Sequence, residues 1–75
     1  MRVIIVDSKN ISQVIEIDEN KYVRDLMDKI KEEKGINGKI ILHFNAEILE
    51  ENETISFYEI KENSHIIYMG EFRGG

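Results

Sequence analysis

The chain has 75 residues, which is room for one domain, because a second core would need roughly 50 residues of its own. It contains no cysteine, and this excludes disulfide frameworks, zinc ribbons and cysteine nucleophiles. Its 15 acidic and 10 basic side chains give a net charge of −5, which opposes binding to nucleic acid and to membranes, so we expect neither as a partner.

The N-terminal residues predict a β-hairpin. Residues 1–7 and 11–17 are rich in β-branched aliphatic side chains, and the polar residues 8–10 between them favour a turn. The second segment has an apolar face with the two-residue period of a strand, which we expect in the core. The residues of that face are Ile11, Ile15 and Ile17.

An amphipathic helix is predicted next, because apolar residues recur at steps of three and four along residues 22–30. This apolar stripe consists of Tyr22, Val23, Leu26, Met27 and Ile30. Asn20 is the predicted N-cap, and Gly35 after a lysine-rich turn predicts that the helix ends near Lys34. Asp25 and Lys29 stand four apart and are predicted to pair on the solvent side.

The rest of the chain predicts three further strands. Turn residues separate a strand at 39–44, a very short strand at 48–49, a helical turn within 55–60 and a last strand at 64–70. The order of strand, strand, helix, strand, short strand and strand predicts an α+β fold.

The side of the sheet away from the helix is predicted to be unusually apolar. Residues such as Leu42, Ile66 and Ile5 are expected to face the helix, so their neighbours in the strands must face water. Those neighbours are Ile4, Val6, Ile41, His43, His65, Ile67 and Met69. Contiguous exposed apolar patches tend to mark protein-binding sites, which is the interpretation we favour over β-propensity alone.

No catalytic or metal site is predicted. His43 and His65 share a predicted sheet face, but the sequence offers no evident third ligand for a metal. There is no P-loop, nucleophile elbow or dinucleotide-binding glycine motif, and acidic pairs such as Glu50-Glu51 are interpreted as solubilising charge. We therefore expect no cofactor and no enzymatic activity.

The sequence Arg73-Gly74-Gly75 is the most unusual feature, because two glycines at a chain end cannot pack, cap or pair. A strip without side chains can pass through a narrow tunnel and present a carboxylate to a nucleophile or nucleotide of another protein. Taken alone, the two glycines favour a frayed end or a cloning scar, because chain termini are commonly disordered.

The chain resembles the ubiquitin family over all of its length, with a one-residue gap after the helix. The resemblance rests on Lys29-Ile30, Gly35-Ile36, Leu42-His43-Phe44, Leu49-Glu50, residues 54–60 and Arg73-Gly74-Gly75. It implies a β-grasp fold, in which a mixed sheet of four to five strands packs on one α-helix. The implied domain covers residues 1–70, and residues 71–75 form a flexible tail.

The resemblance also implies a ubiquitin-like protein modifier. An activating enzyme would adenylate the Gly75 carboxylate with ATP, and a carrier cysteine would then pass it to an amine of a target protein. The implied partners are activating and conjugating enzymes, target proteins and a deconjugating protease. Two alternatives stay open: a sulfur carrier with a C-terminal thiocarboxylate, and a non-conjugated interaction domain. We expect a soluble monomer in the cytoplasm, and also in the nucleus if the source is eukaryotic.

Two departures from the family pattern concern recognition. Glu71 stands where the family has an arginine that discriminates among activating enzymes, so the segment Glu71, Phe72 and Arg73 is expected to select a dedicated enzyme. In the family's recognition face, His43 replaces an isoleucine, Ile67 a histidine, Met69 a valine and Ser8 a leucine. With Ile41 they form the expected partner-binding face, which should bind ordinary ubiquitin receptors poorly.

A third departure concerns chain formation. Glu47 and Glu62 occupy the positions of two lysines that commonly link ubiquitin chains. The possible acceptor amines that remain by resemblance are Lys29 and the α-amine of Met1.

Overall fold

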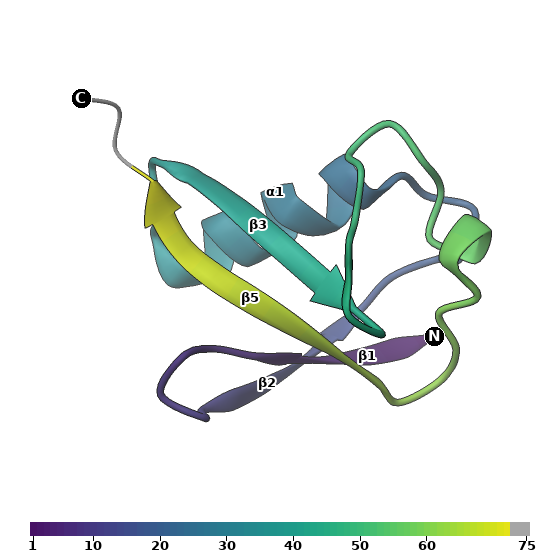
Figure 1. Ribbon diagram of the computed structural model, residues 1–75, viewed down its shortest axis with the longest axis horizontal. Coiled ribbons are helices and arrows are strands. Elements are labelled where there is room, and N and C mark those ends of the chain that lie inside the picture. The colour runs from purple at the N-terminus through teal and green to yellow at the C-terminus, as the bar shows by residue number, and fades with distance from the viewer. Residues whose placement is uncertain (73–75) are drawn as a thin grey trace.

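The computed structural model describes residues 1–72, which form five strands, one α-helix and one turn of 3₁₀ helix (Figure 1). These are β1 (Arg2–Val6), β2 (Ser12–Glu16), α1 (Val23–Lys34), β3 (Lys39–Phe44), β4 (Glu47–Ile48), η1 (Ser56–Tyr58) and β5 (Ser64–Phe72). Arg73, Gly74 and Gly75 lie outside the described residues. Within the described part, no helix is both long and apolar enough to cross a membrane.

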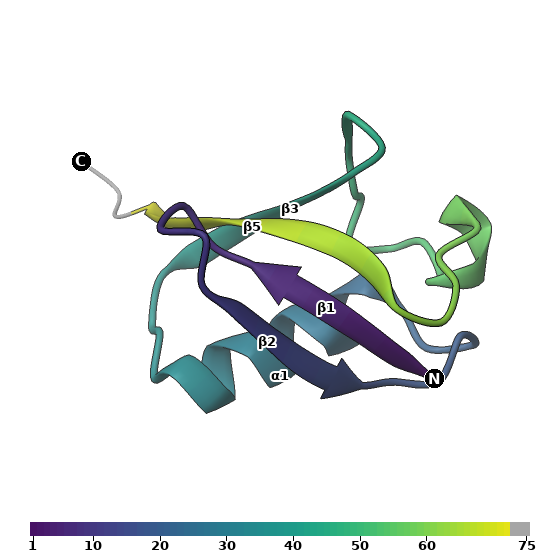
Figure 2. The same cartoon turned by 90° about the horizontal axis from the view of Figure 1, so that it is seen from below.

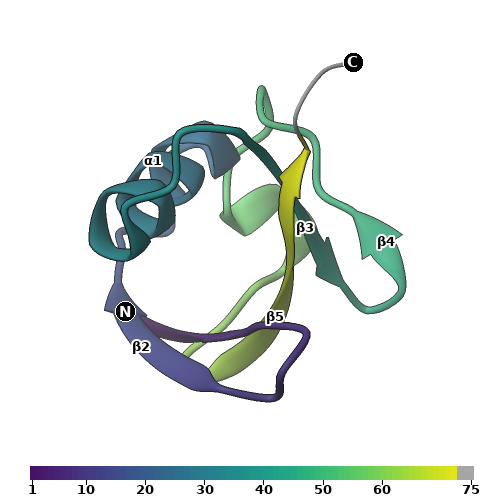
Figure 3. The same ribbon diagram turned by 90° about the vertical axis from the view of Figure 1, so that its left-hand side faces the viewer.

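The sheet has the strand order β2-β1-β5-β3-β4 and is mixed. β1 and β5 run parallel, whereas β1 with β2, β3 with β5 and β3 with β4 are antiparallel. Figure 2 shows β2, β1, β5 and β3 side by side, and Figure 3 shows the sheet curving around α1, which covers one face. The predicted α+β architecture, a β-grasp fold with one helix on a five-stranded sheet, is confirmed.

The hydrophobic core lies between α1 and the covered face of the sheet. Its buried residues are Val3, Ile5, Ile15, Ile17, Val23, Leu26, Ile30, Ile40, Leu42, Leu49, Ile55, Ile60, Ile66 and Tyr68. The three-to-four-residue period therefore identified Val23, Leu26 and Ile30 of the helix correctly, whereas Tyr22, which the predicted stripe also included, is 43% exposed. The two-residue period identified the buried positions of β1, β3 and β5 correctly. Met1, Met27 and Phe44 are partly buried and pack against this core.

Ile11 was predicted in the core, and this prediction is wrong. Its side chain is 57% exposed, because Ile11 belongs to the turn between β1 and β2 and pairs with Asp7, not with an apolar residue. The Asp7 N–H donates to the Ile11 carbonyl at 3.1 Å, and the Ile11 N–H donates to Asp7 Oδ1 at 3.0 Å. The alternation of the strand thus ends one residue before it reaches Ile11.

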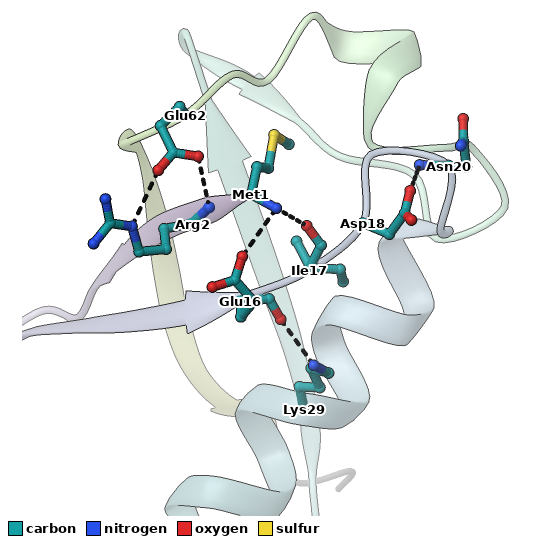
Figure 4. A network of polar contacts seen from close by, with 8 residues as sticks. All are labelled: Met1, Arg2, Glu16, Ile17, Asp18, Asn20, Lys29 and Glu62. Carbon is teal, nitrogen blue, oxygen red and sulfur yellow. Dashed lines mark hydrogen bonds and ion pairs between the residues drawn. The ribbon is translucent and has the colours of Figure 1, made fainter.

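The predicted start of the helix is also corrected. Tyr22 is the N-cap, and its own N–H donates to Asp25 Oδ2 at 3.0 Å, whereas Asn20 belongs to a turn closed by Asp18 (Figure 4). The first N–H groups of α1 donate to carbonyls from the segment after β4, those of Glu51 and Glu53. These distant acceptors serve the helix N-terminus, so α1 begins later than the local sequence suggests.

The helix ends as predicted. Gly35 has φ +67°, in the left-handed region that a C-terminal glycine typically adopts, and its N–H donates to the Lys31 carbonyl. The Ile36 N–H donates to the same carbonyl at 2.9 Å, so the last turn of α1 is capped by the backbone of the following loop.

Two strand boundaries differ from prediction. Asn45 and Ala46 both have positive φ, as the two-residue hairpin turns require, so β4 begins at Glu47 and ends at Ile48. β5 continues to Phe72, two residues beyond the predicted end, because the start of β3 pairs with it at Lys39 opposite Phe72. The tail predicted to begin at residue 71 therefore contributes its first two residues to the sheet.

Candidate functional site

The sheet face turned away from α1 carries a band of aliphatic side chains. In the middle row, His43 of β3 lies between Ile48 of β4 and Ile67 of β5, and Ile67 in turn lies beside Val6 of β1. In the next row toward the end of β5, Ile41 is opposite Met69. We call this surface the outer patch: Ile4, Val6, Val14, Ile41, His43, Ile48, Ile67 and Met69.

The outer patch is exposed where a partner would contact it. Ile48, Ile67 and Met69 are 58%, 51% and 44% exposed, while Ile4, Val6 and Ile41 between them are half-buried by their neighbours. Single exposed aliphatic residues are ordinary on a protein surface, but here they adjoin across four strands. The structure places Ile41, His43, Ile67 and Met69 on one face, as predicted, and their role in binding stays a prediction.

Ser8 and Ile48 lie at the margins of this surface. Ser8 is exposed in the β1–β2 turn, beyond the end of β1, and its role in partner binding stays a prediction. Ile48 was not predicted to belong to the face, yet the β3–β4 pairing places it directly opposite His43. The signal for Ile48 was the two-residue turn at Asn45 and Ala46, which fixes the register of the hairpin.

The two histidines lie in different rows of the outer face. His43 is opposite Ile67, whereas His65 is opposite Ile4 on the neighbouring strand. Residues 1–72 contain no group of three or more histidine, cysteine, aspartate or glutamate side chains arranged to hold a metal ion. What the described face offers is an apolar surface with the His43 imidazole in its middle row, which suits protein contacts.

Both amines expected as acceptors are engaged in contacts (Figure 4). The Met1 ammonium donates to the Ile17 carbonyl at 2.9 Å and forms an ion pair with Glu16 Oε2 at 3.0 Å. The Lys29 Nζ donates to the Glu16 carbonyl at 2.8 Å. A nucleophilic amine must be free of such contacts, so each would first have to leave its partners.

The predicted pair between Asp25 and Lys29 is not formed. Asp25 is turned toward the helix N-terminus, where its carboxylate accepts the Tyr22 N–H. Lys29 is instead turned toward the end of β2 and ties α1 to Glu16. Both side chains satisfy backbone groups, which the spacing of charges along the helix does not reveal.

Glu62 joins the loop before β5 to the start of β1. Glu62 Oε1 accepts the Arg2 N–H and Oε2 accepts Arg2 Nε–H, both at 3.0 Å, and the second contact is also an ion pair (Figure 4). The backbone hydrogen bond from Arg2, followed by its side-chain hydrogen bond, lowers the pKa of Glu62 below its ordinary value. Glu62, which stands at the position of a family linkage lysine, thus links the loop before β5 to the start of β1.

The C-terminal residues are placed only in part. Glu71 and Phe72 complete β5 beside the start of β3, at the end of the sheet where the α1–β3 connection also lies. Arg73, Gly74 and Gly75, the rest of the expected recognition segment and the expected conjugation terminus, lie outside the described residues.

Comparison with known proteins identifies the family. The family model described as Ubiquitin family matches residues 2–73, which is nearly the whole chain. A search of curated protein sequences finds no match. The matched range contains every strand and the helix that hold the outer patch, and the chain therefore belongs to the ubiquitin family.

Proposed function

We propose that the protein is a ubiquitin-like modifier that is attached to other proteins through Gly75. The observation that supports this most directly is the Arg73-Gly74-Gly75 sequence immediately after the last strand of a ubiquitin-family domain. Glycine residues add no side chain, so this segment fits a narrow enzyme channel that a bulkier sequence would not enter.

The chemistry requires a free carboxylate on Gly75 and an activating enzyme. The Gly75 carboxylate attacks the α-phosphate of ATP, which gives an acyl-adenylate and releases pyrophosphate. An enzyme cysteine displaces AMP to form a thioester, and an amine of the target displaces the cysteine to form an amide. In this proposal the protein supplies the electrophile and is not itself an enzyme.

The outer patch is proposed to be the surface by which partners recognise the modifier. Receptors shaped for the family's usual face would meet the imidazole of His43 where they expect an aliphatic side chain. Partners shaped for Ile41, Ile67 and Met69 would bury the exposed aliphatic area of the patch and gain its transfer free energy.

Glu71 is proposed to select the activating enzyme, since it reverses the charge that the family commonly presents there. Reversing one partner of a desolvated charge pair commonly reduces binding by about 2 to 5 kcal/mol. With purified ubiquitin-activating enzyme, ATP–pyrophosphate exchange should be at least about tenfold faster for Glu71→Arg than for the wild type. Equal rates for the two proteins would show that Glu71 does not select the enzyme.

The decisive test is expression of an N-terminally tagged chain in the cells of origin, with wild-type Gly75, with Gly75 deleted and with Gly75→Ala. Lysates are separated with and without reductant, and the free protein is analysed by intact mass. Bands that resist reductant and require Gly75 are expected. A tag turns the Met1 ammonium into an amide, which keeps one N–H for the Ile17 carbonyl and loses the ion pair with Glu16.

The same experiment separates the alternatives. A free protein whose mass carries a terminal thiocarboxylate, with no reductant-resistant bands, would replace the proposal with sulfur delivery. A chain without either product, in cells shown to contain activating enzymes, would leave the outer patch as the basis of a non-conjugated interaction domain. The outer patch favours that second candidate specifically, because it is complete without residues 73–75.

A further inference from the structure

A groove of about 290 Å³ lies on the flank of α1, apart from the outer patch. One face of the helix supplies Arg24, Met27, Asp28 and Lys31, which lie on successive turns. The start of β3 supplies Lys39 and Ile40, and the segment after β4 supplies Glu51. That segment passes the N-terminal end of α1, where the Arg24 N–H donates to the Glu51 carbonyl at 3.2 Å (Figure 1).

The groove has an apolar base and a charged rim. Met27 is half-buried and Ile40 is buried, and both pack with the core, so they form a firm apolar contact area. The long thioether side chain of methionine adapts its shape to a neighbouring apolar group. Around this base stand three basic and two acidic side chains, a net charge of +1 in a chain whose net charge is −5.

The basic groups of the rim are not neutralised by the described carboxylates. The ion pairs among the described side chains join Met1 to Glu16 and Arg2 to Glu62, and none within 4.0 Å involves Arg24, Lys31 or Lys39. The Arg24 guanidinium lies over the Tyr22 ring, 5.3 Å from its centroid. The three cations of the groove therefore form no ion pair with Asp28, Glu51 or another described carboxylate, and their excess of one positive charge makes the groove complementary to an acidic ligand.

The size and charge of the groove define the ligand further. Small-molecule sites usually have volumes of roughly 300 to 1,000 Å³, so a groove at the lower limit suits one or two side chains of a protein. The apolar base of Met27 and Ile40 offers a contact to an aliphatic side chain that inorganic phosphate cannot use. We infer that the groove docks a segment of a partner protein in which a glutamate or aspartate adjoins a large aliphatic side chain.

In this arrangement the aliphatic side chain lies on Met27 and Ile40, and the carboxylate lies between Lys31 and Lys39. Both lysines flank the α1–β3 connection, and Lys39 is opposite Phe72, the last residue of β5. A partner that holds residues 73–75 therefore has this groove close by. The inference does not depend on conjugation, because the groove is formed entirely by residues 24–51.

The test is an NMR titration of the ¹⁵N-labelled full-length chain with two peptides, acetyl-Leu-Glu-Leu-amide and its neutral match acetyl-Leu-Gln-Leu-amide. The glutamate peptide should shift the backbone amides of Met27, Lys31, Lys39 and Ile40 and reach saturation. The glutamine peptide should bind at least about fivefold more weakly, because it lacks the charge that the lysines attract.

Two charge-matched double variants locate the site. Lys31→Glu/Lys39→Glu should weaken binding of the glutamate peptide at least about tenfold. Lys9→Glu/Lys61→Glu changes the net charge equally but lies outside the groove, so it should alter binding of the glutamate peptide less than about twofold. Lys31 lies in the last turn of α1, where a glutamate would also destabilise the helix. The single variant Lys39→Glu, which leaves the helix sequence unchanged, is therefore titrated as well and should bind the glutamate peptide about threefold more weakly.

Three results would overturn the inference. The first is equal binding of the glutamate and glutamine peptides. The second is equal weakening by the two double variants, which would show attraction by net charge alone. The third is tighter binding of inorganic phosphate than of the glutamate peptide at the same amides, which would assign the groove to phosphate and not to an acidic protein segment.

Discussion

Both faces of the sheet carry aliphatic residues, but α1 covers one face and the other is exposed to solvent. Leu42 of β3 and Ile66 of β5 are fully buried under α1, whereas Ile67 and Met69, also of β5, are about half exposed. Aliphatic side chains therefore occur on both faces, and the position of the helix alone decides which become core. An exposed face of this mixed sheet that keeps aliphatic residues without a covering layer supports the proposal that a partner protein covers it.

The largest expected effect tests the covered face. Leu42→Ala should lower the free energy of unfolding by about 2 to 5 kcal/mol, because it leaves a cavity where the side chain is fully buried. That is a large share of the roughly 4 to 11 kcal/mol typical of a chain this long. The measurement is urea unfolding followed by circular dichroism.

The matched control is Ile67→Ala on the other face, where a loss of less than about 1 kcal/mol is expected. If the two variants were destabilised equally, the outer patch would have to contribute to the fold as much as the core does, and its interpretation as a binding surface would be wrong.

The second prediction concerns which partner proteins bind the uncovered face. An NMR titration with a ubiquitin-binding domain should leave His43, Ile67 and Met69 unshifted in the wild type. The variant Ser8→Leu/His43→Ile/Ile67→His/Met69→Val presents the family's usual face and should bind at least about tenfold more tightly, because the receptor then meets at all four positions the side chains for which it is shaped. Strong shifts at these positions in the wild type would contradict the prediction.

The third prediction compares two glycines that have open space around them. A Cβ on Gly35 or on Gly70 would meet no atom within 4 Å, yet only Gly35 has a left-handed φ, of +67°. Gly35→Ala should therefore lower stability by about 1 to 2 kcal/mol through backbone strain alone. Gly70→Ala should be neutral or slightly stabilising. Equal thermal shifts for the two variants would show that strain at the end of α1 is not what the glycine relieves.

Much of this fold could be predicted because its signals are local. The alternation in β1, β3 and β5 and the apolar stripe of α1 identify the core, and Gly35 identifies the helix end. The diglycine and the family resemblance likewise needed only the sequence. Each of these features depends on residues within a few positions of one another.

The features that were missed depend on distant partners. The helix begins at Val23 because carbonyls of Glu51 and Glu53 receive its first N–H groups, and Lys29 reaches the Glu16 carbonyl instead of Asp25. The basic groove is formed by α1, β3 and the segment after β4, whose residues do not adjoin in sequence. Such contacts follow from the packing of the sheet on the helix, which no periodicity encodes.

The smallest expected effect concerns the polar contact at the start of β1, which contrasts with both apolar faces of the sheet. Arg2 donates two hydrogen bonds to Glu62 and lowers the pKa of that carboxyl below its ordinary value of 4.5. A lowered pKa means that the folded state favours the ionised form, so the contribution is complete above about pH 4.5 and is lost as pH falls through the folded pKa. Stability should therefore decline on acidification below about pH 4.5.

Glu62→Gln should remove this part of the acid dependence, so that the stability difference between wild type and variant shrinks between pH 6 and pH 3. Because Glu62 is exposed, the effect should be small and is best measured as a shift in the urea midpoint at each pH. Glu32→Gln, on the solvent side of α1, changes net charge equally and should leave the pH dependence closer to that of the wild type. Parallel midpoint curves for wild type and Glu62→Gln would show that the contact between Glu62 and Arg2 contributes no pH-dependent stability.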